Sequence, residues 1–410
     1  MISTVTSIEP AGEPTAARDL AAWPRARSRR TAIVAQFGGD RADLAQWALT
    51  NADPLADAVA AAIHAEGAAV RAAFNKGVTN GLASVTDPHP AVAALLAATE
   101  SRPDYVDDEL LDHGSAPFYT SPGPVHLVSL SAGALIRVYD SPSIASVLTT
   151  TGRLIDGAER RIRETGQWVA TAMLPGALRA GEAGYVATLQ VRLLHAQKRE
   201  VARRRGYDEA AFGAPINQVD LARTWMDFTL TSLRAEEQMG FGLTTNESAT
   251  LYKYWWLIAH LLGIDARLVE GIASNDQAAR VDELLQAVTG PPIPESAQLA
   301  AATVASISSD LHEALSIPTG LGAKALSTLA RRFHGETLSD DLGLPHSATA
   351  AAALNTAIQA TRARRSKLRR DPAKWEAARE RNLGAARKQL ATITDAPEYA
   401  GREPAAGARR

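Results

Sequence analysis

The sequence of 410 residues contains no cysteine. This absence excludes disulfides, thiolate metal sites, iron–sulfur clusters, cysteine-ligated heme and cysteine nucleophiles. A metal in this chain must therefore be held by histidine or by oxygen ligands. Long apolar runs are absent too. No stretch of eighteen or more consecutive apolar residues occurs, so no transmembrane segment is expected.

The common catalytic signatures are also missing. There is no glycine-rich phosphate loop, no His-Glu-x-x-His and no Gly-x-Ser-x-Gly. The histidines are scattered, and none lies three or four residues from another. A metal site built from two histidines on one helix is therefore not expected. A site that needs a single histidine, of which heme is the main example, stays open.

The charge balance gives no electrostatic reason to expect nucleic acid or a membrane surface as a partner, because the formal net charge is only −2. One basic cluster lies at residues 362–370. It is either an anion-binding patch or a solvated helix face. No aromatic residue interleaves with its arginines, and acidic residues follow closely, which favours the solvated face.

The N-terminal sequence allows two interpretations. Ser28-Arg29-Arg30 faintly resembles a twin-arginine export signal, but the apolar stretch after it is short and ends at Asp40. The other interpretation is a polar N-terminal arm over 1–40, which predicts a cytoplasmic protein. A disordered tail is expected at the other end, over 391–410.

Apolar residues recur every three or four positions in this alanine-rich sequence, which is the period of an α-helix. No alternating pattern is long enough to build a sheet, and no repeat occurs at solenoid spacing. The pattern predicts an all-α fold with a single large helical domain over 41–390. Helices are expected over 41–66, 90–100, 151–173 and 182–205, from Asn217 or Asp220 to about 237, and from Thr244 or Thr245 to Leu262; the proline-rich stretch 101–127 is expected to be an extended loop, and 127–148 to be buried.

Two helical segments carry polar residues in a pattern typical of a site. In the first, Arg161 and Thr165 are four residues apart, so both would present hydrogen-bond donors on one face. In the second, His195 lies in an apolar stripe with Arg192 and Arg199 one turn away on either side. A histidine in such a stripe is either a packed core residue or a ligand. The two arginines either neutralise heme propionates or are surface charges with apolar stems.

Four sequence blocks occur in the order found in one known family. The chain resembles the catalytic domain shared by latex-clearing proteins and MpaB-type oxygenases, over roughly residues 100–290. That resemblance implies a globin-like helical core around a b-type heme (heme b), with O2 as co-substrate. The blocks are 151–168 (TGRLIDGAERRIRETGQW), 191–199 (VRLLHAQKR), 215–229 (PINQVDLARTWMDFT) and 241–265 (FGLTTNESATLYKYWWLIAHLLGID).

The resemblance also assigns roles to residues. His195 falls on the axial ligand of the heme iron, and Arg161 and Thr165 fall on the distal pair near the oxygen-binding side. A cation such as Arg161 stabilises negative charge that develops on oxygen. His260 matches a family histidine that we treat as structural.

Two positions depart from the rubber-cleaving members. Glu164 stands where those members have a lysine, and Ala145 stands where an ungapped comparison places their glutamate. Glu164 is either a proton acceptor on a buried wall or an exposed helix residue paired with Arg160 or Arg161. Both departures favour a small apolar or isoprenoid substrate over polyisoprene.

The leading hypothesis is a heme b-dependent oxygenase that uses O2 to oxidise or cleave a C=C bond of an apolar or isoprenoid substrate, with Arg161, Thr165 and Glu164 as catalytic residues. One alternative is a biosynthetic tailoring heme oxygenase or peroxidase-like enzyme. The others are a non-catalytic heme sensor or carrier, and a helical interaction protein without heme. An absorption spectrum separates the last from the rest.

Overall fold

The computed structural model describes residues 22–151, 158–393, 397 and 399, and these residues form helices and no strand. The expected all-α fold is confirmed. The helices are α1 (Arg30–Phe37), α2 (Gly39–Thr50), α3 (Pro54–Glu66), α4 (Ala68–Asn80), α5 (Pro90–Glu100), α6 (Asp108–His113), α7 (Gly123–Val128), α8 (Ile136–Val138), α9 (Pro142–Thr150), α10 (Ala158–Ala172), α11 (Ala183–Arg204), α12 (Glu209–Phe212), α13 (Gln218–Met226), α14 (Ser232–Gln238), α15 (Thr245–Leu262), α16 (Asn275–Thr289), α17 (Pro294–Leu315), α18 (Thr319–His334), α19 (Glu336–Asp341), α20 (Ala348–Arg369) and α21 (Pro372–Ala391). Short 3-10 turns lie at η1 (Leu82–Ser84), η2 (Ala116–Thr120) and η5 (Ala266–Leu268), and π-helical turns at η3 (Ser129–Leu135) and η4 (Asp227–Thr231).

Helix starts that were predicted from capping residues are confirmed. The Asn217 side chain accepts a hydrogen bond from the Asp220 N–H at the start of α13. Thr244 and Glu247 form a reciprocal capping box at the start of α15. That helix ends at Gly263, whose φ of 75° is the left-handed conformation that glycine adopts without a steric penalty.

Two predicted elements were wrong, both because of proline. The helix expected over 41–66 is two helices, since Pro54 starts α3 behind the capping residue Asp53. The loop expected over 101–127 contains α6, η2 and α7. A proline lies in the first turn of both η2 and α7, where the missing N–H costs no helical hydrogen bond. Of the helix expected over 151–173, residues 152–157 lie outside the described residues.

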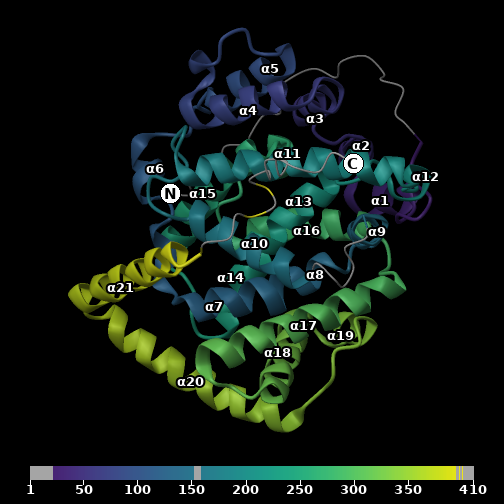
Figure 1. Ribbon diagram of the computed structural model, residues 1–410. Coiled ribbons are helices and arrows are strands. Elements are labelled where there is room, and N and C mark those ends of the chain that lie inside the picture. The colour runs from purple at the N-terminus through teal and green to yellow at the C-terminus, as the bar shows by residue number, and fades with distance from the viewer. Residues whose placement is uncertain (1–21, 152–157, 394–396, 398, 400–410) are drawn as a thin grey trace, which may run out of the picture.

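The long α11 forms the centre of the molecule. It packs against α10, α15 and α3, and also contacts α9. Figure 1 shows α10, α11, α13 and α15 between the group α3–α5 and the group α17–α20. The π-helical turns η3 and η4 pack against each other beside this centre. Such turns insert an extra residue into a helix and often occur next to functional sites.

The chain ends are partly packed, in contrast to the loose arm and tail that we expected. Arg27 is 5% exposed; its Nε donates to the Phe212 carbonyl at 3.0 Å and its Nη2 lies 3.1 Å from Asp220 Oδ1. At the other end, Tyr399 is 9% exposed. Residues 1–21 and 400–410 lie outside the described residues.

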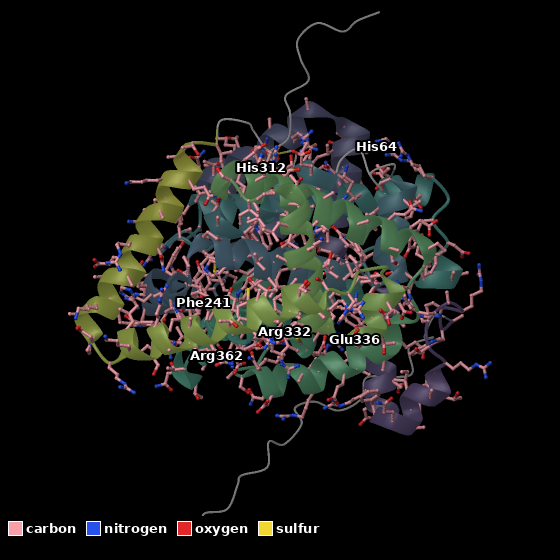
Figure 2. The ribbon with its side chains drawn as sticks, turned by 90° about the horizontal axis from the view of Figure 1, so that it is seen from below. His64, Phe241, His312, Arg332, Glu336 and Arg362 are labelled. Carbon is pink, nitrogen blue, oxygen red and sulfur yellow. The ribbon has the colours of Figure 1, made fainter. Side chains whose placement is uncertain are left out.

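The basic cluster at 362–370 is not simply a solvated face. The guanidinium groups of Arg365 and Arg369 lie 4.9 and 4.6 Å from the centre of the Trp375 ring, and Arg365 also lies 4.7 Å from Phe241. Figure 2 shows α20, with Arg362 labelled on it, close to Phe241. These contacts stack two arginines on aromatic faces, and they attach α20 to α21 and to the segment before α15.

We predict that His334, at the end of α18, makes the fold sensitive to acid. Its Nε2 bonds the Ala132 carbonyl in η3 at 2.9 Å, and burial lowers its pKa from 6.5 to about 4. Between pH 6.5 and 4 the unfolded chain binds a proton that the folded chain does not. The free energy of unfolding should therefore fall on acidification through that window, by up to about 1.4 kcal/mol per pH unit from this group.

Denaturant unfolding of wild type and His334→Gln at several pH values checks this expectation. Glutamine cannot titrate but keeps an N–H donor. The variant should lose less stability than wild type between pH 6.5 and 4. An identical pH dependence in both proteins would contradict the assignment.

Candidate functional site

An apolar cavity of about 280 Å³ lies between α10, α11, α13 and α15. Its volume is at the small end of ligand cavities. Most of its lining is aliphatic or aromatic, with a few polar groups. The lining residues are Leu135, Val138, Tyr139, Ile144, Val147, Leu148, Thr151, Arg161, Ile162, Glu164, Thr165, Trp168, Val191, Leu194, His195, Lys198, Ile216, Asp220, Leu221, Thr224, Trp225, Phe228, Trp255, Leu262, Ile264 and Tyr399.

His195 faces this cavity from the middle of α11. Burial, with a smaller contribution from the Arg199 charge, lowers its pKa to about 4, so the imidazole is neutral at pH 7. Its Nδ1 is buried without a hydrogen-bond partner. A buried polar atom without a partner costs free energy, so it calls for an explanation in a folded protein. A neutral imidazole on an apolar wall is the form of histidine that ligates metals.

The distal pair predicted from the sequence lies in the same cavity, on α10. The Arg161 Nη2 donates to the Tyr139 hydroxyl at 3.3 Å, and its guanidinium lies 6.0 Å from the centre of the Tyr139 ring. Thr165 differs from expectation, because its hydroxyl donates to the Arg161 carbonyl at 2.7 Å. Its proton is therefore used within the helix, and only its oxygen lone pairs are available to the cavity.

Glu164 lies on the cavity wall and is paired with Arg160, while its role as a proton acceptor stays a prediction. The residue lines the cavity with its side chain 15% exposed, and its Oε1 accepts from the Arg160 Nε at 2.8 Å. Tyr399 lies close by. Burial and then the Glu164 charge raise the pKa of Tyr399 to about 12, so its hydroxyl keeps its proton at neutral pH. Ala145 is fully buried in a small apolar cluster and does not line the cavity.

Tyr139, Tyr399 and Asp220 are three of the cavity residues that were not predicted as site residues. Tyr139 belongs to the apolar stretch before α9, where the sequence pattern indicates an ordinary core residue. Tyr399 belongs to the expected tail. Asp220 was predicted only as a helix cap, yet it lines the cavity. Its carboxylate accepts from the Ser143 hydroxyl at 2.6 Å and pairs with Arg27. No sequence pattern near these residues announces the site, because each reaches it through the tertiary fold.

The two arginines on either side of His195 bind α3 and do not line the cavity. The Arg192 Nε and Nη2 lie 2.6 and 2.9 Å from the two carboxylate oxygens of Asp53, and its Nη1 donates to the Leu261 carbonyl. The Arg199 Nε lies 2.6 Å from Asp57 Oδ1. Both terminal nitrogens of Arg199 are buried without a hydrogen-bond partner. The Arg192 guanidinium therefore bonds protein groups with all three of its nitrogens, in contrast to its predicted contact with a propionate. Arg199 keeps two donors that bond no protein group.

His260 lies outside this cavity, in a separate cleft beyond the end of α15. Over the described part of the chain, no group of three or more histidine or carboxylate side chains is arranged to hold a metal ion. Heme iron needs only one or two side-chain ligands from the protein, because the macrocycle supplies the others.

The family follows from comparison with known proteins. The family described as "ER-bound oxygenase mpaB/B'/Rubber oxygenase, catalytic domain" matches residues 122–363. That span is more than half of the sequence. The chain belongs to this oxygenase family, and the resemblance stated from the sequence is confirmed.

One solved structure, "Structure of Latex Clearing Protein LCP in the closed state", has a TM-score of 0.64 with this chain at 19% identity. The match covers 89% of this chain and 95% of the other. At that identity the likeness shows the fold alone. No curated protein matches the chain. None of the helices in the described ranges is long and apolar enough to cross a membrane.

We predict that the Arg192–Asp53 pair stabilises the fold whether or not a ligand is present. Asp53→Asn removes the charge but keeps a side-chain oxygen to cap α3. The Arg192 guanidinium is then left buried without a counter-ion, because its side chain is 6% exposed. The free energy of unfolding of the ligand-free chain should fall by about 3 kcal/mol or more, measured by denaturant titration.

Asp265→Asn is the matched control. Its partner Arg267 is 56% exposed, so this change should cost about 1 kcal/mol or less. If Arg192 served only a bound propionate, Asp53→Asn would leave the ligand-free chain as stable as the control.

Proposed function

We propose that this chain is a heme b-dependent oxygenase that uses O2 to oxidise or cleave a C=C bond in a small apolar or isoprenoid substrate. The observation that carries the proposal is His195, a neutral histidine with an unpartnered Nδ1 on the wall of an apolar cavity, facing the same space as Arg161. Family membership supports the use of O2. The chemistry of the cavity supports the cofactor and the class of substrate.

The residues present fit a heme. His195 would hold the iron, and aliphatic and aromatic side chains from α9, α13 and α15 would surround the macrocycle. Iron bound in this way would supply oxygen activation. Arg199 keeps two buried donors without a hydrogen-bond partner, but neither it nor Arg192 lines the cavity, so we assign neither arginine to a propionate. The chain has no cysteine, and among the described lining residues His195 offers the nitrogen best suited to ligate the iron.

Arg161 supplies a fixed positive charge on the cavity wall. Its contact with the Tyr139 hydroxyl holds the guanidinium in place, and Tyr139 is 1% exposed. A cation in an apolar, water-poor space interacts with developing negative charge more strongly than it would in water. Arg161 therefore favours any step in which oxygen atoms gain negative charge.

Glu164 holds a carboxylate at the same wall and is our candidate for the proton acceptor. The carboxylate is ion-paired to Arg160, whose Nε lies 2.8 Å from its Oε1. Thr165, one residue further along α10, offers only an acceptor oxygen, so it would orient a donor such as water rather than give a proton. Glu164 and Ala145 also replace residues of the rubber-cleaving pattern, which supports a substrate smaller than polyisoprene.

We expect chain purified after expression with heme to show a Soret absorption band, and His195→Ala to lose it. The reason is that no second histidine lines the cavity. The matched control is His64→Ala, because the His64 side chain is 65% exposed and lies on α3, away from the cavity. Far-ultraviolet circular dichroism should show both variants folded. Absence of the band in wild type, or its persistence in folded His195→Ala, would refute the heme assignment.

Oxygen uptake with short isoprenoids should fall about a hundredfold in Arg161→Leu, the usual cost of removing one charge-stabilising donor. The heme spectrum should remain. Arg163→Leu, on the exposed side of the same helix and 54% exposed, is the control and should keep nearly full uptake. Heme binding without any uptake in wild type would instead indicate a sensor or carrier. Equal loss in both variants would argue against a distal role for Arg161.

A further inference from the structure

A second, larger cleft of about 530 Å³ lies beside the apolar cavity. The segment before α6 forms one side, and the end of α15 with the η5 region forms the other. The lining residues are Ala98, Ser101, Arg102, Pro103, Asp104, Tyr105, Trp256, Ala259, His260, Ile264, Ala266, Val269 and Glu270. Charges of both signs lie among them, so the cleft has no strong preference for an anion or a cation.

Ile264 is the residue that lines both the cleft and the apolar cavity. Its backbone N–H bonds the Ala259 carbonyl at 2.9 Å, directly after the left-handed Gly263. Gly263 is itself wedged against the Arg192–Asp53 pair, since a Cβ there would meet both side chains within 2.7 Å. The backbone at this position is therefore held firmly, and Ile264 is the lining residue that the two spaces share.

The walls around Ile264 are held as well. Tyr105 and Trp256 meet edge to face with ring centres 5.5 Å apart, and the Trp256 Nε1 donates to the Ile272 carbonyl at 3.0 Å. An isoleucine side chain can change rotamer without moving the backbone. A shared side chain next to a wall held by such contacts is the natural candidate for a barrier between the two spaces.

We propose that the cleft is an outer chamber through which small neutral apolar molecules reach the cavity, and that Ile264 controls their passage. This inference rests on the proposed function for the class of molecule that enters, and it adds the route and the residue that limits the size of the molecule. Ile264 is thus a specificity-determining residue and does not take part in the chemistry.

The test follows entry of a neutral apolar dye, N-phenylnaphthylamine, into the full chain without added heme. Stopped-flow fluorescence records energy transfer from the cavity tryptophans Trp168, Trp225 and Trp255 to the dye. Ile264→Trp should slow both association and dissociation about tenfold, and Ile264→Ala should speed both several-fold. The equilibrium Kd should change less than twofold, because a gate alters rates in both directions.

Leu148→Trp is the matched control. It adds the same bulk to the cavity wall at a position that does not line the cleft. Its dye association rate should stay near that of wild type. Unchanged rates in both Ile264 variants, or slowing in Leu148→Trp alone, would overturn the proposal. Changes in Kd without changes in rate would also overturn it, since they would make Ile264 a packing residue.

The dye experiment requires neither heme nor oxygenase activity. A failure of the heme assignment therefore leaves its outcome intact. Conversely, a missing gate effect leaves the Soret band and the oxygen uptake unaffected. The Ile264→Ala variant keeps the test valid if the tryptophan variant does not fold, because truncation to alanine adds no bulk.

Discussion

The buried pairing of α11 with α3 is the constraint on which the site depends. Arg192 and Arg199 lie two turns apart on α11 and are held by Asp53 and Asp57 of α3. His195 lies one turn from each arginine. Because both flanking turns are held, a rotation or shift of α11 would separate the buried arginines from their carboxylate partners. Leaving a buried charge without its partner costs several kcal/mol. We infer that these ion pairs set the orientation of the His195 ring through the position of α11. The ring has no hydrogen bond at its own Nδ1 that could do so.

The same anchor extends to the outer cleft. Gly263 packs against the Arg192–Asp53 pair, so the turn that carries Ile264 is set by the contacts that set His195. The Arg192 Nη1 also bonds the Leu261 carbonyl near the end of α15. One buried ion pair thus connects α3, α11 and α15, and it fixes the positions of the candidate ligand and of the candidate gate together.

The sequence predicted the features that depend on neighbouring residues, namely the helices and their ends. Helical period and capping residues placed α10, α11 and α15, and four-residue spacing correctly put Arg161 and Thr165 on one face. That face lines the apolar cavity. The proline-rich stretch failed, because a proline in the first turn of a helix and a proline in a loop look alike without knowledge of where the helix begins. Pro124 in α7 is an example.

Long-range contacts account for what the sequence could not show. Asp53 is 139 positions from Arg192, so nothing near Arg192 reveals that its charge is already satisfied. Tyr139, Asp220 and Tyr399 reach the cavity from segments far apart in the chain. Each has an ordinary local role as a core residue, a helix neighbour or a tail residue. The position of such a site depends on which segments fold together around it. The helical period reveals only the residues that share one face of a helix, such as Arg161 and Thr165.

The distribution of charge in the cavity gives the strongest argument about its chemistry. His195 and Tyr399 are both neutral at pH 7, since burial shifts the pKa of each toward its uncharged form. Asp220 is compensated by Arg27. The remaining ionic groups are concentrated on α10 and at Lys198, which leaves the rest of the wall apolar. Such a cavity solvates an alkene well and a charged substrate poorly, while it keeps a cation and a carboxylate on one side. Glu164 stands where the rubber-cleaving members have a lysine, so the side-chain charge at this position differs by two units. We therefore expect this position to contribute to a difference in substrate between this chain and those members.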